Sequence, residues 1–133
     1  MINRQDKSKA RDTIKQVAEA IHQRDLSVWA YPEGTRSKGR GLLPFKTGAF
    51  RMAIEAGVPI TPMVVSTTHN KIDLNCRNNG VVITEMLEPI DTTNYSLSDA
   101  RALAEHCHQL MEAKIAELDK EVAALEAQHS FSV

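Results

Sequence analysis

The chain has 133 residues, a length that supports one domain with one core rather than two. Hydrophobic residues make up 42% of it and charged residues 25%, so it does not have the composition of a disordered chain. The formal net charge of -1 argues against a general nucleic-acid-binding protein, which is usually strongly basic. The charge is uneven, because residues 1–66 contain eleven Lys and Arg against six Asp and Glu, whereas residues 67–133 contain five against eleven. The first half therefore suits an anionic ligand.

Two further classes of protein are disfavoured by the sequence. No apolar run approaches the roughly 18 residues that a membrane span needs, and the charged stretch 1–11 does not resemble a signal peptide. Cys76 and Cys107 lie outside the spacings typical of zinc sites, so we expect two reduced thiols. His106 and His108 flank Cys107, but neighbouring helical positions point in different directions, so we expect no metal site.

The first half of the chain predicts two helices around a strand and a loop. Residues 7–24 carry apolar side chains at helical spacing and predict a helix. Residues 27–31 predict a short strand, in which Trp29 is expected to belong to the core. The glycine-rich stretch 33–44 predicts a loop, and residues 47–56 predict a second helix.

The second half predicts two more strands and one long helix. The strands are expected at residues 59–66 and 80–87, and the helix at about residues 97–128. Strands alternating with helices predict an α/β fold, with a small, incomplete sheet flanked by helices and a long C-terminal helix. The later apolar positions of that helix have heptad spacing, so it is expected either to pack on the domain or to contact a partner or a membrane surface. These positions are Met111, Ile115, Leu118, Val122 and Leu125.

The loop and its flanks concentrate the charged chemistry of the chain. Between positions 31 and 50, four cations stand against one acid, Glu33, and glycines allow a ligand to approach the backbone closely. Because the loop leads into the start of a helix, it predicts a phosphate-binding site. The alternative is a solvated basic surface loop. It is neither a P-loop nor a dinucleotide fingerprint, because Arg40-Gly41 follows Gly39 and Pro44 stands where a third glycine belongs. The cations are Arg36, Lys38, Arg40 and Lys46.

Three ordered segments resemble motifs of the glycerolipid acyltransferases. Residues Tyr31–Ser37, YPEGTRS, resemble the family's FPEGTRS motif. Residues Pro44–Gly48 resemble its FKxG element, and residues Val58–Pro62 resemble its VPIxP motif. The resemblance is to the bacterial 1-acyl-sn-glycerol-3-phosphate acyltransferases and covers nearly the whole chain. It implies a partial glycerolipid-acyltransferase fold.

The resemblance also implies a reaction. The family transfers an acyl group from acyl-CoA or acyl-carrier protein to lysophosphatidate and forms phosphatidate, at the cytoplasmic face of the bacterial inner membrane. No bound cofactor is implied, and acyl-CoA or acyl-carrier protein would be the acyl-donor substrate. The family's catalytic motif is His-x-x-x-x-Asp, in which the histidine is the general base and the aspartate orients it. No histidine of this chain has an aspartate five residues later.

We therefore expect residues 1–133 to be the C-terminal part of an acyltransferase domain. Residues 1–92 would be its motif-bearing α/β part, and residues 93–133 the long helix and tail. The catalytic pair would lie in a missing N-terminal half, and this chain alone would be inactive. The alternative function is a non-catalytic module that binds anionic lipid or a partner protein.

Carried over residue by residue, the resemblance implies a pocket for the acceptor phosphate. Arg36 would pair with the phosphate, because a guanidinium matches phosphate oxygens. Glu33 would hold the loop, while Gly34 and Thr35 would shape its turn and offer hydrogen-bond donors.

Four other residues complete the implied site. Arg4, at the end of a segment that resembles a second family motif, would be another phosphate-binding cation, and Lys46 would add charge. Pro59 and Pro62 would fix the start of a strand beside the pocket.

Overall fold

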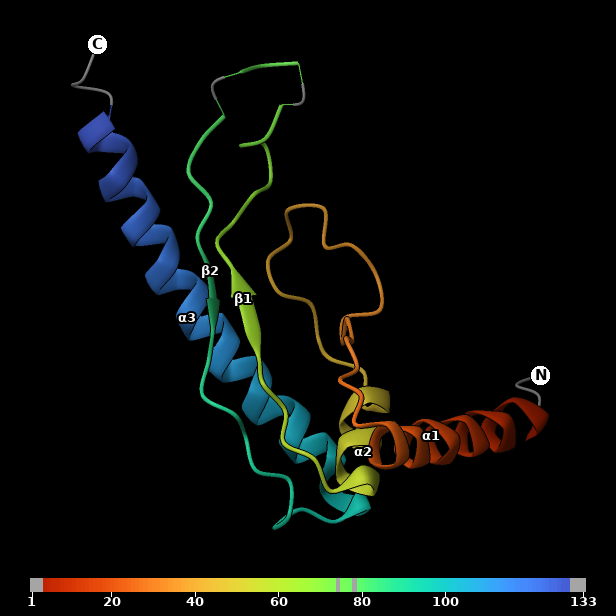
Figure 1. The fold of residues 1–133 in the computed structure, drawn as a ribbon. Coiled ribbons are helices and arrows are strands. Elements are labelled where there is room, and N and C mark those ends of the chain that lie inside the picture. Colours follow the sequence, from red (N-terminus) through yellow and green to blue (C-terminus); the bar gives the residue numbers. More distant parts are fainter. Residues whose placement is uncertain (1–3, 74, 78, 130–133) are drawn as a thin grey trace.

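The protein is described by a computed structural model that covers residues 4–129 except 74 and 78, with side chains from residue 8 onward. Helix α1 spans Arg4–Arg24 and helix α2 spans Gly48–Ala56. Strands β1 (Met63–Val65) and β2 (Thr84–Met86) follow. A 3-10 turn, η1 (Leu97–Asp99), then leads into helix α3 (Ala100–His129), as Figure 1 shows. The mixed α/β class and all three predicted helices are confirmed.

Capping interactions mark the end of α2 and the start of the turn that leads into α3. Gly57 ends α2 in the left-handed conformation, with φ +64°, and its N–H donates to the carbonyl of Ile54 at 3.1 Å. Before α3, the N–H of Ser96 donates to the carboxylate of Asp99 at 3.0 Å and helps to hold the pKa of that carboxyl below its usual value.

The sheet is smaller than the sequence predicts. Strands β1 and β2 pair antiparallel, with Val64 opposite Glu85, and an isolated bridge joins Ile60 to Ile90. The predicted strands 59–66 and 80–87 thus contain β1 and β2 but overestimate their length. The prediction of a strand at residues 27–31 is wrong, because no other described segment supplies the hydrogen-bonding partner that a strand requires.

The side chains of this extended segment are open to solvent. Trp29 is 67% exposed and Tyr31 is 87% exposed, so the expectation that Trp29 belongs to the core is also wrong. The core lies instead where the loop before α2, α2 itself and the first turns of α3 meet. Its buried side chains are Phe45, Phe50, Leu103, Ala104 and Cys107.

Helix α3 runs along the two strands in Figure 1 and packs against β1. Leu118 and Val122 are fully buried on it, so this part of its apolar stripe packs on the domain, one of the two predicted alternatives. The carboxylate of Asp119 accepts hydrogen bonds from the N–H of Thr67 at 2.7 Å and from its hydroxyl at 2.6 Å. Lys114 pairs with Glu85 of β2 at 3.0 Å.

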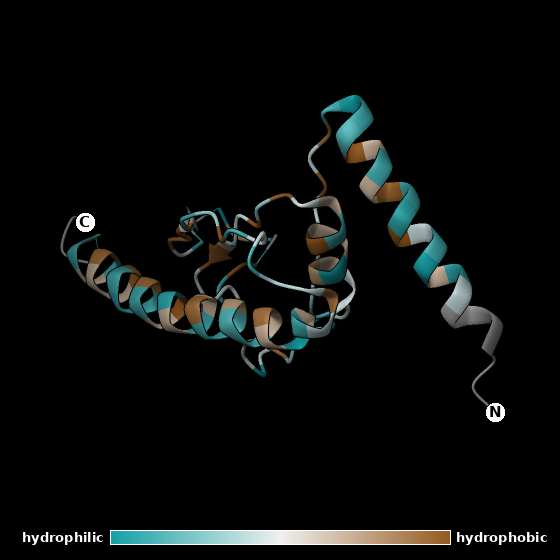
Figure 2. Cartoon of the chain, turned by 90° about the horizontal axis from the view of Figure 1, so that it is seen from below, coloured by the Kyte–Doolittle hydropathy of each residue, from teal (hydrophilic) through white to brown (hydrophobic). Residues whose placement is uncertain are grey.

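Helix α1 packs against α2 and then extends away from the rest of the fold (Figure 2). Ala18 is the buried apolar residue that α1 contributes among its described side chains. Among the described residues, no helix has the length and apolar character that crossing a bilayer requires.

Candidate functional site

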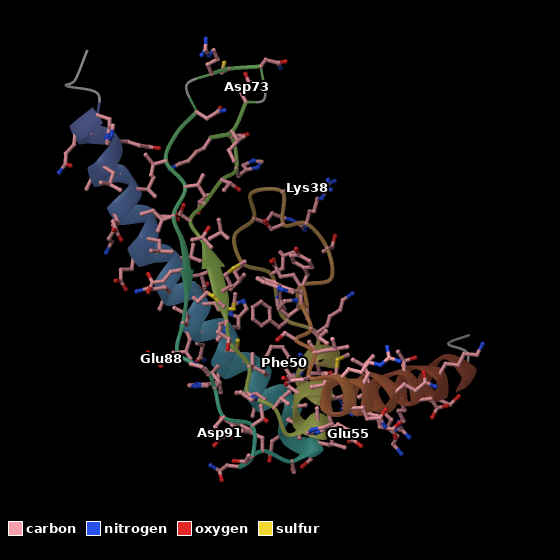
Figure 3. The ribbon with its side chains drawn as sticks, viewed as in Figure 1. Lys38, Phe50, Glu55, Asp73, Glu88 and Asp91 are labelled. Carbon is pink, nitrogen blue, oxygen red and sulfur yellow. The ribbon has the colours of Figure 1, made fainter. Side chains whose placement is uncertain are left out.

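Residues 31–46, here called the motif loop, connect the extended segment 26–30 to the start of α2. The loop projects as a wide excursion beside β1 in Figure 1. It opens with a turn in which the N–H of Gly34 donates to the carbonyl of Tyr31 at 3.0 Å. Its tip is marked by Lys38 in Figure 3. The cations predicted to bind phosphate are therefore presented on a protruding element.

Glu33 closes the motif loop across its base. Its carboxylate oxygen Oε2 accepts a hydrogen bond from the N–H of Leu43 at 2.8 Å, in a partly buried position. A charged acceptor makes a shorter and stronger hydrogen bond than a neutral one. This hydrogen bond joins the first and last parts of the loop.

Because Gly34 has no side chain, the side chain of Lys46 can lie against the turn at residues 31–34. Its φ is +67°, a conformation that residues with a Cβ rarely adopt. A Cβ at Gly34 would lie 2.7 Å from Nζ of Lys46 and 2.9 Å from its Cε. The N–H of Lys46 also donates to the carbonyl of Pro32 at 2.8 Å. The structure therefore brings Lys46 against the turn that precedes Arg36.

A second close approach ties the loop tip to the segment that follows β1. Gly39 has φ +85°, and a Cβ there would overlap the imidazole ring of His69. His69 itself is exposed. The bare backbone of Gly39 thus lets the loop tip lie against His69.

Helix α3 holds the last part of the motif loop from the opposite side. The guanidinium of Arg101 donates from Nη1 to the carbonyl of Phe45 at 3.2 Å. Nε2 of His108 lies 3.3 Å from the carbonyl oxygen of Leu42. The rings of His108 and Phe45 meet edge-on, with their centroids 4.9 Å apart. Sequence reasoning missed both residues, although their spacing of seven places them on one face of a helix.

A cleft of about 230 Å³ lies beside this anchor and does not include Arg36. Arg101, Glu105, His108 and Phe45 are among the residues that line it. The cleft thus lies where α3 holds the loop, whereas Arg36 is exposed outside it.

Arg36 is exposed and makes no hydrogen bond or ion pair with any other described residue. The ammonium of Lys46 is likewise unpaired within the described part of the chain. Arg40 differs, because its Nε donates to the carbonyl of Ser37 at 2.9 Å and helps to shape the loop. A guanidinium whose N–H groups are free can donate hydrogen bonds to two phosphate oxygens at the same time.

The structure gives less detail on the other predicted site residues, one of which has its side chain outside the described residues. Arg4 is the first residue of α1, but its side chain lies outside the described part, as do residues 2 and 3 of its motif. Thr35 is exposed on the turn beside Arg36. Pro62 is buried directly before β1, and its carbonyl accepts from the N–H of Leu87 at 2.8 Å, whereas Pro59 is exposed.

The histidine and cysteine residues of α3 do not converge. Cys107 is buried in the core, where burial raises the pKa of its thiol to about 11, while His108 faces the motif loop. Throughout the described residues, no three His, Cys, Asp or Glu side chains are grouped so that they could hold a metal ion. Cys76 and Cys107 are both free thiols.

Comparison with known proteins gives consistent results. The acyltransferase family model matches residues 1–66. The chain is 59% identical over 127 residues to the 1-acyl-sn-glycerol-3-phosphate acyltransferase of Escherichia coli strain K12, covering 96% of this chain and 52% of that protein. It is 37% identical over 121 residues to the human 1-acyl-sn-glycerol-3-phosphate acyltransferase beta, covering 90% of this chain and 44% of that protein.

The fold is shared with a solved relative. The crystal structure of the 1-acyl-sn-glycerophosphate acyltransferase PlsC from Thermotoga maritima superposes with a TM-score of 0.61 at 24% identity. The match covers 82% of this chain and 43% of that one. The chain spans about half the length of the bacterial relatives it matches. By motif, sequence and fold, it belongs to the family of bacterial 1-acyl-sn-glycerol-3-phosphate acyltransferases.

Proposed function

We propose that this chain is the acceptor-binding part of an enzyme that acylates lysophosphatidate in phospholipid synthesis. In the reaction, the free hydroxyl of the acceptor attacks the carbonyl carbon of a thioester, and the thiol leaves. The donor is acyl-CoA or acyl-carrier protein, and the product is phosphatidate. The observation that carries this proposal is the unpaired guanidinium of Arg36 on a loop closed by Glu33.

The geometry of the motif loop supports binding of a phosphate monoester. Such a group carries between one and two negative charges near neutral pH, because its second pKa is about 6. Arg36 and Lys46 supply two positive charges, with the backbone N–H groups of the turn at Gly34 and Thr35 as additional donors. Arg4 is proposed as a further cation of this site. Pro59 and Pro62 are proposed to fix the backbone beside it.

The cations of the motif loop would bind the phosphate, so a different group must activate the acceptor hydroxyl. Because no histidine in residues 1–133 has the family's spacing to an aspartate, we propose that polypeptide outside these residues supplies the general base. Residues 1–92 would then carry the acceptor site, and residues 93–133 would support it through α3. The complete enzyme would act at the cytoplasmic face of the inner membrane, where its lipid substrate is found.

The acceptor site can be tested by binding. We would titrate the purified chain with a short-chain lysophosphatidate below its micelle concentration and, separately, with the matching monoacylglycerol, which lacks the phosphate. We expect Arg36→Ala to weaken lysophosphatidate binding by about tenfold or more, since hydrogen bonds to charged groups contribute about 1.5–3 kcal/mol. The matched control is Arg77→Ala, an exposed arginine outside the motif loop. Equal affinity of the wild-type chain and Arg36→Ala would refute the site.

The absence of a general base is tested separately by activity. With lysophosphatidate and radiolabelled acyl-CoA, the purified chain is expected to form no phosphatidate above the rate without protein. Turnover that scales with the concentration of the chain would show that residues 1–133 do contain the base.

The alternative is a non-catalytic module that binds anionic lipid or a partner protein, which the missing histidine motif favours. Sedimentation with vesicles separates the two functions. Retention on any anionic lipid at low salt, lost at high salt, indicates a general surface binder, because salt screens exposed charges. Selective retention on vesicles that contain lysophosphatidate indicates the acceptor site.

A further inference from the structure

A second basic cleft, of about 310 Å³, lies between α1 and α2, and no residue of the motif loop lines it. Glu55, labelled in Figure 3, marks it at the junction of the two helices. Three cations, one carboxylate and two apolar side chains surround it. These are Arg11, Lys15, Arg51, Glu55, Ile14 and Leu97.

Helical spacing explains why these groups converge. Arg11 and Lys15 are four residues apart and therefore lie on one face of α1. Arg51 and Glu55 have the same spacing on α2. Since α1 packs against α2, the two charged faces are brought to the same cleft.

The positive charge of the cleft is not compensated. No ion pair or side-chain hydrogen bond joins its four charged groups to one another or to other residues in the described part of the chain. Three cations and one carboxylate leave a net charge of +2 around a small volume. Cations that line one cleft raise the local potential, which attracts an anion with several charges.

We propose that this cleft binds the phosphorylated adenosine end of coenzyme A, the carrier of the acyl donor. This inference rests on the proposed acyltransferase function. Coenzyme A has three phosphate groups around one adenosine, so its charge complements the Arg and Lys side chains. Its thioester lies at the far end of a long flexible arm, so the adenosine end need not touch the motif loop.

The other residues that line the cleft suit a nucleotide better than a bare phosphate. Ile14 and the 43%-exposed Leu97 offer apolar surface on which an adenine ring can lie. The carboxylate of Glu55 would repel a simple anion, but it can accept hydrogen bonds from an amino or hydroxyl group. A volume of about 310 Å³ is at the lower end of the range for small-molecule sites, so it suits one nucleotide rather than the whole coenzyme.

The test is a titration of the chain with adenosine 3′,5′-bisphosphate, which carries two of the phosphates without the arm or the acyl group. We expect Arg51→Gln and Lys15→Gln each to weaken binding by about tenfold, and high salt to weaken it in the wild-type chain. The matched control is Arg24→Gln, which removes an exposed arginine of α1 outside the cleft. Circular dichroism would establish that the variants fold.

Two measurements identify the ligand, and each has an outcome that would overturn the proposal. Inorganic phosphate should compete at least tenfold more weakly than the nucleotide, whereas equal competition would make the cleft a general anion site and overturn the proposal. Unchanged nucleotide affinity in both Arg51→Gln and Lys15→Gln would also overturn it.

Failure here can be told apart from failure of the acceptor site. Arg36→Ala should impair lysophosphatidate binding and leave nucleotide binding unchanged, and Arg51→Gln should do the reverse. If Arg36→Ala behaves as expected and Arg51→Gln has no effect on the nucleotide, only the donor cleft is refuted.

Discussion

The carboxylate of Glu33 and the backbone N–H of Leu43 are joined by a hydrogen bond of 2.8 Å across the base of the motif loop. Ten residues separate the two partners, so this contact closes most of the loop, inside the hydrogen bond from the N–H of Lys46 to the carbonyl of Pro32. Arg36 lies inside the closed segment and is not itself held by any described residue. The loop is therefore fixed at its base, while the guanidinium of Arg36 stays available to a ligand.

Removing this contact should loosen the loop. Glu33→Ala leaves the N–H of Leu43 without its charged acceptor, and we expect amide exchange at Leu43 to accelerate and the free energy of unfolding to fall by about 1 kcal/mol. Glu33→Gln, which keeps an acceptor oxygen, should have a smaller effect. Glu88→Ala, an exposed glutamate elsewhere, is the control. An unchanged exchange rate at Leu43 in Glu33→Ala would contradict the assigned role.

Gly34 is expected to tolerate no side chain, whereas Gly48 is expected to tolerate one. Gly34→Ala places a Cβ at φ +67° and close to the end of the Lys46 side chain, so we expect a loss of about 1 kcal/mol in stability and weaker lysophosphatidate binding. Gly48 begins α2 and has open space around a Cβ, so Gly48→Ala should leave stability unchanged or raise it slightly. Thermal unfolding compares the pair, and equal shifts in Tm would show that conformation at Gly34 is unimportant.

The helices and the family motif of the loop were predictable because their signals are local. Apolar residues at helical spacing mark α1 and α2, and Gly57 marks the end of α2. The motif at Tyr31–Ser37 is a continuous run of residues, so it can be read without knowledge of the fold.

The errors concern interactions between distant parts of the chain. Whether residues 27–31 form a strand depends on a neighbour to pair with, which a local pattern of apolar residues does not specify. The anchors on α3 were missed for the same reason. Arg101 lies 56 residues from Phe45, and His108 lies 66 residues from Leu42, so only the packing of α3 reveals which backbone carbonyls they meet.

The anchor at Arg101 leads to a prediction about a residue far from the motif in sequence. Arg101→Ala should release the carbonyl of Phe45, accelerate amide exchange in the last part of the motif loop and weaken lysophosphatidate binding several-fold. Arg101→Lys, which keeps a charged donor, should restore part of both. Lys120→Ala, on the exposed side of the same helix, is the control. If Arg101→Ala lowers stability without changing the exchange of the loop or the affinity, Arg101 only supports the core.

The two thiols should differ strongly in reactivity. Burial raises the pKa of Cys107 to about 11, so at pH 8 only about one molecule in a thousand carries the reactive thiolate there, while Cys76 is exposed. We expect iodoacetamide at pH 8 to modify one thiol of the folded chain, which peptide mass spectrometry should locate at Cys76. Modification of Cys107 should increase as the pH is raised towards 11, because a larger fraction of its thiol is then present as the reactive thiolate. In denaturant both thiols should react, which controls for the reagent. Rapid modification of Cys107 in the folded chain at pH 8 would show that the core formed by α2, α3 and the motif loop opens to solvent.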